Sequence, residues 1–168
     1  GLGLWIYSLL TESRGVAPEV AGFVTGSYWG MFTVGRIFAG WYAKKIDVRK
    51  LIYLSISLAL FGVALLLADS SQIITILGVT LAGFAIAPIF PGLVSSTTSR
   101  VGFRHQANTI GMQIAAAGLG VAVVPSIAGV LARNFGLEVI PLYLLSILAL
   151  LLLVFIISNS LSGEYTLD

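Results

Sequence analysis

The sequence contains no cysteine and very little charge. Only 10% of its 168 residues are charged, whereas soluble domains carry about 25%. Without cysteine, the chain has no disulfides, no thiolate catalysis and no thiol-ligated metal. The formal net charge is only +2, and the basic residues are divided among short segments, which argues against nucleic-acid binding.

The residue patterns that accompany enzyme activity are also missing. The single histidine, His105, lies in "TTSRVGFRHQAN", which is typical of a solvated loop, and HExxH, GxSxG and GxxxxGK do not occur. None of the seven acidic residues lies inside an apolar segment, where a proton relay would need them. We therefore expect no enzyme activity, no cofactor and no metal site, and any proton-coupling carboxylate is expected outside this chain.

Apolar residues, by contrast, are abundant. They form 58% of the chain, and the mean hydropathy is +1.02. Several segments approach the ~20 residues that cross a bilayer as a helix, which predicts an all-α integral membrane protein forming one bundle over 1–168. The predicted spans are 1–10, 20–43, 51–68, 73–96, 109–132 and 139–158. The first is too short to cross and there is no initiating Met, so we expect a truncated helix in a longer polypeptide.

Positive charge is concentrated in alternate connections between these segments. Loop 97–108 contains Arg100 and Arg104, and loop 44–50 contains a larger cluster. That cluster is Lys44, Lys45, Arg49 and Lys50. The positive-inside bias therefore predicts that both loops, and by parity the C-terminus, are cytoplasmic. We expect the protein in the plasma membrane, which in a bacterium is the inner membrane.

The apolar segments differ in composition. Segments 51–68 and 139–158 are rich in Leu and Ile, whereas 20–43 and 109–132 are rich in small residues. Three glycines recur every fourth residue, at Gly22, Gly26 and Gly30. Such a face lets another helix approach closely, and packing alone is the alternative to a functional role. The composition repeats after three segments, which predicts a 3+3 inverted repeat like that of many secondary transporters.

Aromatic and amide side chains in the spans are candidate contacts for a solute. They are Trp5, Ser27, Tyr28, Trp29, Asn108 and Gln113. Aromatic rings stack on the apolar face of a sugar, and an amide both donates and accepts, so the set suits a small neutral solute. The alternatives are interfacial anchoring or packing for Trp5 and Trp29, and an interhelical hydrogen bond for Gln113.

Prolines predict an interrupted helix in segment 73–96. Pro88 and Pro91 lie within one turn of each other, and each removes a backbone donor. The freed carbonyls must be satisfied by neighbouring groups or by a water-filled cavity, which indicates a transport pathway. Pro125 occupies a comparable place in segment 109–132.

Arg36 is a charge inside segment 20–43, about two turns from its basic end. An arginine at the centre of a bilayer costs ~2.5–3.5 kcal/mol, and less where the long side chain reaches the interface. From Arg36 that direction leads to the loop containing Asp47. We predict a gating contact that forms and breaks during transport. The alternative is an arginine that only reaches the interface and packs at the helix end.

Three stretches together resemble the C-terminal half of a major facilitator superfamily transporter, and are most similar to the fucose-permease-like sugar transporters. They are "GSYWGMFTVGRIFAGWYAKKIDVRK", "AGFAIAPIFPGLVS" and "NTIGMQIAAAGLGVAVVPSIAGVLARNFGLE". The loop motif of the superfamily, roughly G-x-[LY]-[AS]-D-[RK]-x-G-R-[RK], is matched at Gly40, Tyr42, Ala43, Lys45 and Arg49. It is not matched at Lys44, Asp47 and Val48. Lys44 replaces the acid, whose role Asp47 or a neighbouring helix end would have to take.

The resemblance implies half of a twelve-helix fold, from a partial helix seven to helix twelve, with a missing N-terminal six-helix half as its partner. It also implies alternating access, with helices nine and twelve facing lipid and the coupling carboxylates in the other half. The leading hypothesis is a secondary active transporter, such as a proton symporter, or a facilitative permease for a sugar-like solute. The alternatives are a drug or metabolite exporter of the same superfamily and a non-transporting structural or signalling membrane protein.

Overall fold

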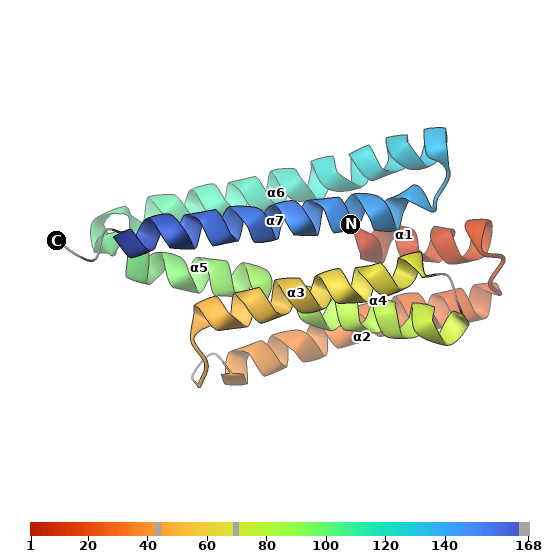
Figure 1. The fold of residues 1–168 in the computed structure, drawn as a ribbon, viewed down its shortest axis with the longest axis horizontal. Coiled ribbons are helices and arrows are strands. Elements are labelled where there is room, and N and C mark those ends of the chain that lie inside the picture. The colour runs from red at the N-terminus through yellow and green to blue at the C-terminus, as the bar shows by residue number, and fades with distance from the viewer. Residues whose placement is uncertain (43–44, 69–70, 165–168) are drawn as a thin grey trace.

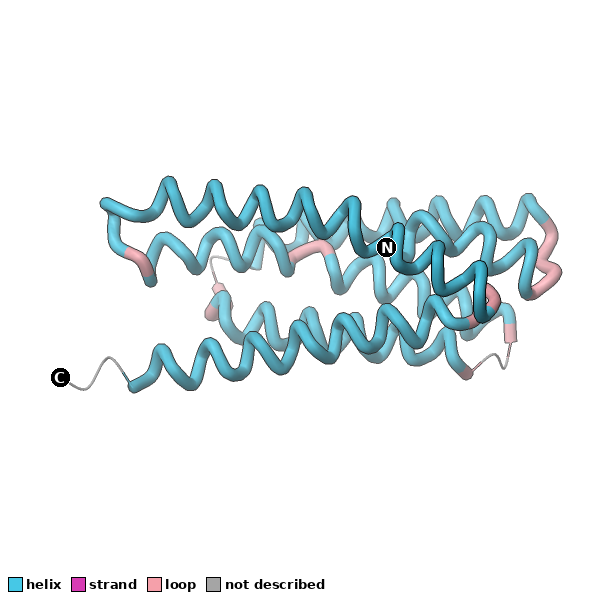
Figure 2. The backbone as a smooth tube through the Cα atoms, turned by 90° about the horizontal axis from the view of Figure 1, so that it is seen from above, coloured by secondary structure: helices cyan, strands magenta, loops and turns pink. Residues whose placement is uncertain are grey.

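The computed structural model describes residues 1–42, 45–68 and 71–164, and in these ranges it is helical with no strand (Figure 1). Ala43 and Lys44 of the loop motif lie outside the described residues. The elements are α1 (Leu2–Ser8), the π-helix η1 (Leu9–Ser13), α2 (Pro18–Tyr42), α3 (Val48–Leu67), α4 (Gln72–Ile86), α5 (Ile89–Arg100), α6 (Gly102–Phe135) and α7 (Val139–Glu164). Figure 2 shows the same helices from above, running along one common long axis.

Four helical stretches in the described ranges are long and apolar enough to cross a membrane. They are Val48–Leu67, Gln72–Thr97, Arg104–Phe135 and Val139–Ser160. The predicted all-α membrane fold is therefore confirmed. α2 is helical over the described part of the predicted segment 20–43, but it is not among the four, because its glycines, hydroxyl side chains and Arg36 lower its hydropathy.

α4 packs between α2 and α3, and glycines allow the backbones to come close together. A Cβ atom added to Gly62 of α3 would lie 2.8 Å from the backbone nitrogen of Ala82, and one added to Gly78 of α4 would lie 2.7 Å from the carbonyl oxygen of Gly62. On the other side of α4, a Cβ atom on Gly83 would lie 2.5 Å from the carbonyl oxygen of Tyr28. Small residues at such crossings are the usual way in which helices associate in lipid.

The glycine face that the sequence predicted for helix packing lies on the side of α2 that does not contact α4. Added Cβ atoms at Gly22, Gly26 and Gly30 would meet nothing within 4 Å. Of the α2 glycines in the segment, Gly35 is the one that packs closely, because its Cβ atom would collide with the carbonyl oxygen of Phe84. Within the described part of the chain, the spaced glycines therefore remain uncovered.

The predicted interruption of segment 73–96 is present where α4 ends and α5 begins. Ala87 and Pro88 separate the two helices but keep right-handed helical dihedrals, so the chain bends without reversing. The backbone N–H of Gly92 donates to the carbonyl oxygen of Pro88 at 2.9 Å, and this bond begins the helical hydrogen bonds of α5. α6, in contrast, continues through Pro125 without interruption.

The buried core lies on the α4 side of the bundle. Its larger cluster joins α1, η1, α2, α3, α4 and α7, and a smaller one contains Ile52, Ile56, Ile89 and Phe155. α6 lies at the edge of the bundle in Figure 1 and packs mainly on α5 and α7. Most of its apolar side chains, including Leu119 and Val121, are exposed. The described chain thus leaves one side of α2 and most of α6 without helical neighbours.

Replacing Gly62 tests the close crossing of α3 and α4. We expect Gly62→Ala to lower the unfolding free energy of the purified full-length protein by about 1–3 kcal/mol, because the added methyl group meets backbone atoms that cannot turn away. Ser57→Ala, at an exposed position of the same helix, is the control. Thermal unfolding in detergent measures both, and a Gly62→Ala protein as stable as the wild type would contradict this packing.

Candidate functional site

Arg14 forms the most connected polar contact in the described structure, and nothing in its sequence surroundings singled it out. Its side chain, only 7% exposed, makes a two-pronged ion pair with Glu138, with Nε 2.9 Å from Oε1 and Nη2 2.7 Å from Oε2. Nη2 also donates to the carbonyl oxygen of Leu66 at 2.7 Å, and Nη1 to Oγ1 of Thr75 at 3.3 Å. One arginine thereby connects the end of η1 to α3, α4 and the α6–α7 turn.

The carboxylate of Glu138 is held in its charged form. The hydrogen bond from Arg14 lowers the pKa of Glu138 below its ordinary value, and a hydrogen bond from Ser13 acts in the same direction. Partial burial opposes them. Glu138 precedes α7 and lies between two candidate spans, so this pair belongs to an end of the bundle rather than to its apolar middle.

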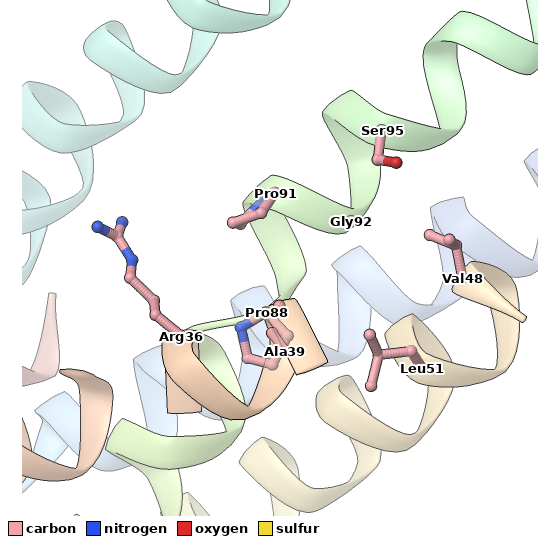
Figure 3. A pocket seen from close by; sticks show the side chains of 9 residues that line it. Arg36, Ala39, Val48, Leu51, Pro88, Pro91, Gly92 and Ser95 are labelled. Atoms are coloured by element: carbon pink, nitrogen blue, oxygen red, sulfur yellow. The ribbon is translucent and has the colours of Figure 1, made fainter. Parts of the chain in front are cut away.

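A cavity of about 430 Å³ lies at the bend between α4 and α5, and Figure 3 shows its lining. Four residues predicted to serve gating or structure meet there: Arg36, Gly40, Pro88 and Pro91. Its other lining residues are Ala39, Val48, Leu51, Gly92 and Ser95. The proline bend and Arg36, which were separate signals in the sequence, are therefore neighbours in space.

Contrary to the prediction from the sequence, Arg36 does not extend towards the loop that holds Asp47. Its guanidinium carbon lies 4.7 Å from the centre of the Phe32 ring, and Figure 3 shows the side chain pointing away from Val48 and Leu51. Asp47 instead caps α3, where Oδ1 accepts the backbone N–H of Arg49 at 3.1 Å. This bond is local, because its two partners lie only two residues apart.

Lys45 also interacts with an aromatic ring. Its Nζ atom lies 4.8 Å from the centre of the Trp41 ring, in an arrangement that favours a cation over an indole face. Arg49, at the start of α3, is exposed. The described part of the loop motif therefore places its cations at the surface of one end of the bundle.

Two of the candidate solute contacts carry buried polar atoms without a partner among the described residues. Nε2 of Gln113 donates to Oγ1 of Thr97 on α5 at 2.7 Å, but Oε1 accepts no hydrogen bond. Nε1 of Trp5 donates none, although the ring packs beside Gly129 of α6. Buried polar groups normally have partners, so an unpaired acceptor and an unpaired donor indicate places where a polar ligand or water can bind.

The other four candidates divide between packing and exposure. Tyr28 is buried against Gly3 and Gly83, and Trp29 meets its ring edge to face with centroids 5.2 Å apart. Oγ of Ser27 donates to the carbonyl oxygen of Val24 within its own helix. Asn108 is exposed on α6. Tyr28 and Trp29 are thus held against α1, whereas Gln113 is held by α5.

Near Pro125, a neighbouring helix contributes a polar contact. The hydroxyl of Tyr143 on α7 donates to the carbonyl oxygen of Val124 at 3.3 Å. A missing N–H at Pro125 frees the carbonyl oxygen of Val121, four residues earlier, and not that of Val124. The Tyr143 hydroxyl therefore links α6 to α7 beside the proline rather than replacing its missing donor.

Comparison with known proteins supplies a family and distant relatives. The family model described as Major Facilitator Superfamily matches residues 2–163. Bypass of stop codon protein 6 of Saccharomyces cerevisiae is 26% identical over 150 residues, which cover 83% of this chain and 30% of that protein. Major facilitator superfamily domain-containing protein 4A of Xenopus tropicalis is 23% identical over 134 residues, or 79% of this chain and 26% of that protein.

The chain therefore spans less than a third of the length of these curated relatives. No solved structure matches it at a significant level. The match to the family model extends over nearly the whole chain, from α1 to the end of α7.

The pair between Arg14 and Glu138 predicts a dependence of stability on pH. A carboxylate whose pKa is lowered by folding stabilises the folded state above its unfolded pKa of about 4.3, and this contribution is lost as the pH falls through the lower folded pKa. We expect Glu138→Gln to unfold at lower temperature at neutral pH, with a loss of about 1 kcal/mol because Glu138 is half exposed. The difference from the wild type should shrink in acid.

Thermal unfolding of the full-length protein across this pH range measures the effect. Glu12→Gln, at an exposed carboxylate in η1, is the matched control. A constant difference between Glu138→Gln and the wild type at every pH would contradict the assigned ion pair.

Proposed function

The chain belongs to the major facilitator superfamily, and on that premise we propose that it is part of a secondary active or facilitative transporter for a small neutral, sugar-like solute. The observation that carries the proposal is the buried, unpartnered Oε1 atom of Gln113 on α6. An amide fixed through its Nε2 atom by Thr97 presents this oxygen as a ready acceptor, and a solute hydroxyl is a matching donor.

The charges of the chain support a neutral solute. Among the described acidic residues, Glu138 is paired with Arg14 and Asp47 caps α3, and neither lies inside a candidate span. A cationic solute would need a carboxylate within the bundle to replace its hydration. Indole and amide groups, which Trp5 and Gln113 supply, instead suit hydroxyl groups and the apolar face of a sugar ring.

We further propose alternating access with a second six-helix unit, as the resemblance to fucose-permease-like transporters implies. The spaced glycines of α2 and the exposed apolar side of α6 support this arrangement, because both lack neighbours in the described chain. The same proposal places this chain as the C-terminal half in a plasma membrane, with loops 44–50 and 97–108 in the cytoplasm. It assigns coupling carboxylates, where coupling exists, to the partner half.

Flux measurements with the full-length protein in proteoliposomes test the function. Uptake and counterflow of a panel of labelled neutral sugars should exceed those of protein-free vesicles for at least one member. Charged amino acids and a lipophilic cation form the comparison set. Flux of none of the neutral solutes in either direction would overturn the proposal, and flux of the lipophilic cation alone would favour an exporter.

Gln113 can be tested with a variant that keeps its size but loses its polar atoms. We expect Gln113→Leu to raise the half-saturation concentration for the transported solute about tenfold, since one hydrogen bond of ~1.4 kcal/mol is lost. Ser146→Ala is the control, because the hydroxyl that it removes bonds the carbonyl oxygen of Leu142 within α7 and lies outside the proposed site. The concentration dependence of uptake gives both values, and unchanged half-saturation in Gln113→Leu would remove this residue from the site.

Arg36 tests the gating proposal. We expect Arg36→Ala to lower the maximal transport rate at least tenfold while the amount of protein in the membrane stays near the wild-type level. The physical reason is that Arg36 lines the cavity at the Pro88 bend and charges inside a membrane bundle are seldom without a role. Arg104→Gln, at an exposed arginine, is the control. Normal flux in Arg36→Ala would contradict the gating role and would show that Arg36 only anchors its helix.

A further inference from the structure

A second cavity lies where α2, α3 and α4 meet, and it is more apolar than the one beside Arg36. This α2–α3–α4 groove has a volume of about 320 Å³. Six apolar or aromatic side chains that line it are Phe38, Tyr42, Ile46, Leu51, Leu54 and Leu58. Leu51, Leu54 and Leu58 follow one another at helical spacing, so one face of α3 forms a continuous wall of the groove.

The α2 wall of the groove is aromatic and open to the surroundings. The Phe38 and Tyr42 rings are stacked with centroids 6.1 Å apart, and Trp41 meets Tyr42 edge to face at 5.3 Å. All three rings are exposed by more than a third, as is Leu54 on the opposite wall. In a membrane-spanning bundle, such a surface contacts either lipid or another protein.

Positive charge surrounds this end of the groove. Lys50 directly precedes Leu51 and lies one helical turn before Leu54, on the same face of α3. Lys45 directly precedes Ile46, and its Nζ atom lies over the Trp41 ring beside the aromatic wall. Segment 44–50 holds four basic residues and one acid, Asp47, whose Oδ1 is already bonded to the N–H of Arg49.

We propose that the α2–α3–α4 groove binds an anionic phospholipid, with an acyl chain along Leu54 and Leu58 and the phosphate between Lys45 and Lys50. The apolar walls match an acyl chain, and the two exposed ammonium groups match the negative headgroup. A soluble anion would leave the apolar walls uncovered, and an apolar protein partner would leave the lysines unpaired. Basic residues beside a membrane-spanning helix attract anionic lipids by this charge complementarity.

The bound lipid would touch the wall of the Arg36 cavity. Ala39, Leu51 and Pro88 line both that cavity and the groove. The proposal depends on the membrane location of the chain but not on the nature of its solute. A failure of lipid binding and a failure of sugar transport are therefore separate results.

Native mass spectrometry of the full-length protein tests the site, with phosphatidylglycerol and phosphatidylcholine of equal chain length as probes. We expect phosphatidylglycerol to form the more abundant adduct in the wild type. The double variant Lys45→Gln/Lys50→Gln should lower phosphatidylglycerol affinity by about fivefold for each lysine, the factor expected for a basic residue at an anionic membrane surface. Phosphatidylcholine affinity should stay the same.

A second variant separates the groove from general attraction to the surface. Leu54→Trp fills the groove and should lower the adducts of both lipids, whereas Arg104→Gln, an exposed cation outside the groove, should leave both unchanged. Equal binding of the two lipids by the wild type, or an unchanged preference in Lys45→Gln/Lys50→Gln, would overturn the proposal. Displacement of phosphatidylglycerol by inorganic phosphate would also overturn the proposal. A dimer that Leu54→Trp dissociates would overturn it as well, because that result would assign the groove to a second copy of the protein.

Discussion

The close approach of α4 to both α2 and α3 is the constraint from which the arrangement of this bundle follows. Hydrocarbon gives helices no hydrophobic reason to associate, so contact depends on fitting backbones together. Gly62 and Gly78 permit this on one side of α4, and Gly35 and Gly83 permit it on the other. Because α4 is fixed between its neighbours, the bend at Pro88 starts from a defined place and carries α5 away from α2. The space left by that divergence holds the cavity that Arg36 lines, and Pro88 also lines the neighbouring α2–α3–α4 groove.

Features that depend on local sequence were predictable, and contacts between distant segments were not. Hydropathy located the apolar helices, and Pro88 located the bend, because a missing backbone donor acts within its own turn. The regular spacing of Gly22, Gly26 and Gly30 was conspicuous but faces no helix of the described chain, whereas the isolated Gly62 makes a close contact. Spacing indicates that a face is smooth, but only the position of the neighbouring helix decides whether it is covered.

The candidate site shows the same distinction at the level of single side chains. Asp47 was expected near Arg36, but its carboxylate accepts the backbone N–H of Arg49, which lies only two residues along the chain. Arg14 and Glu138 lie 124 residues apart, and no local pattern pairs them. For Gln113 the interhelical hydrogen bond to Thr97 is present, and the solute contact stays a prediction for the amide oxygen, which has no partner among the described residues. An amide has two ends, and a single sequence position cannot show which end the fold will use.

The low hydropathy of α2 has a consequence for how the protein is assembled. α3, the α4–α5 pair, α6 and α7 each have enough apolar length to enter the bilayer individually. α2 carries Arg36 and an uncovered row of glycines, and its transfer into lipid as a lone helix is correspondingly less favourable. The helix synthesised first among these is therefore the one that most needs the others. Its place in the bilayer is therefore expected to depend on α4, which packs closely against it at Gly35 and Gly83.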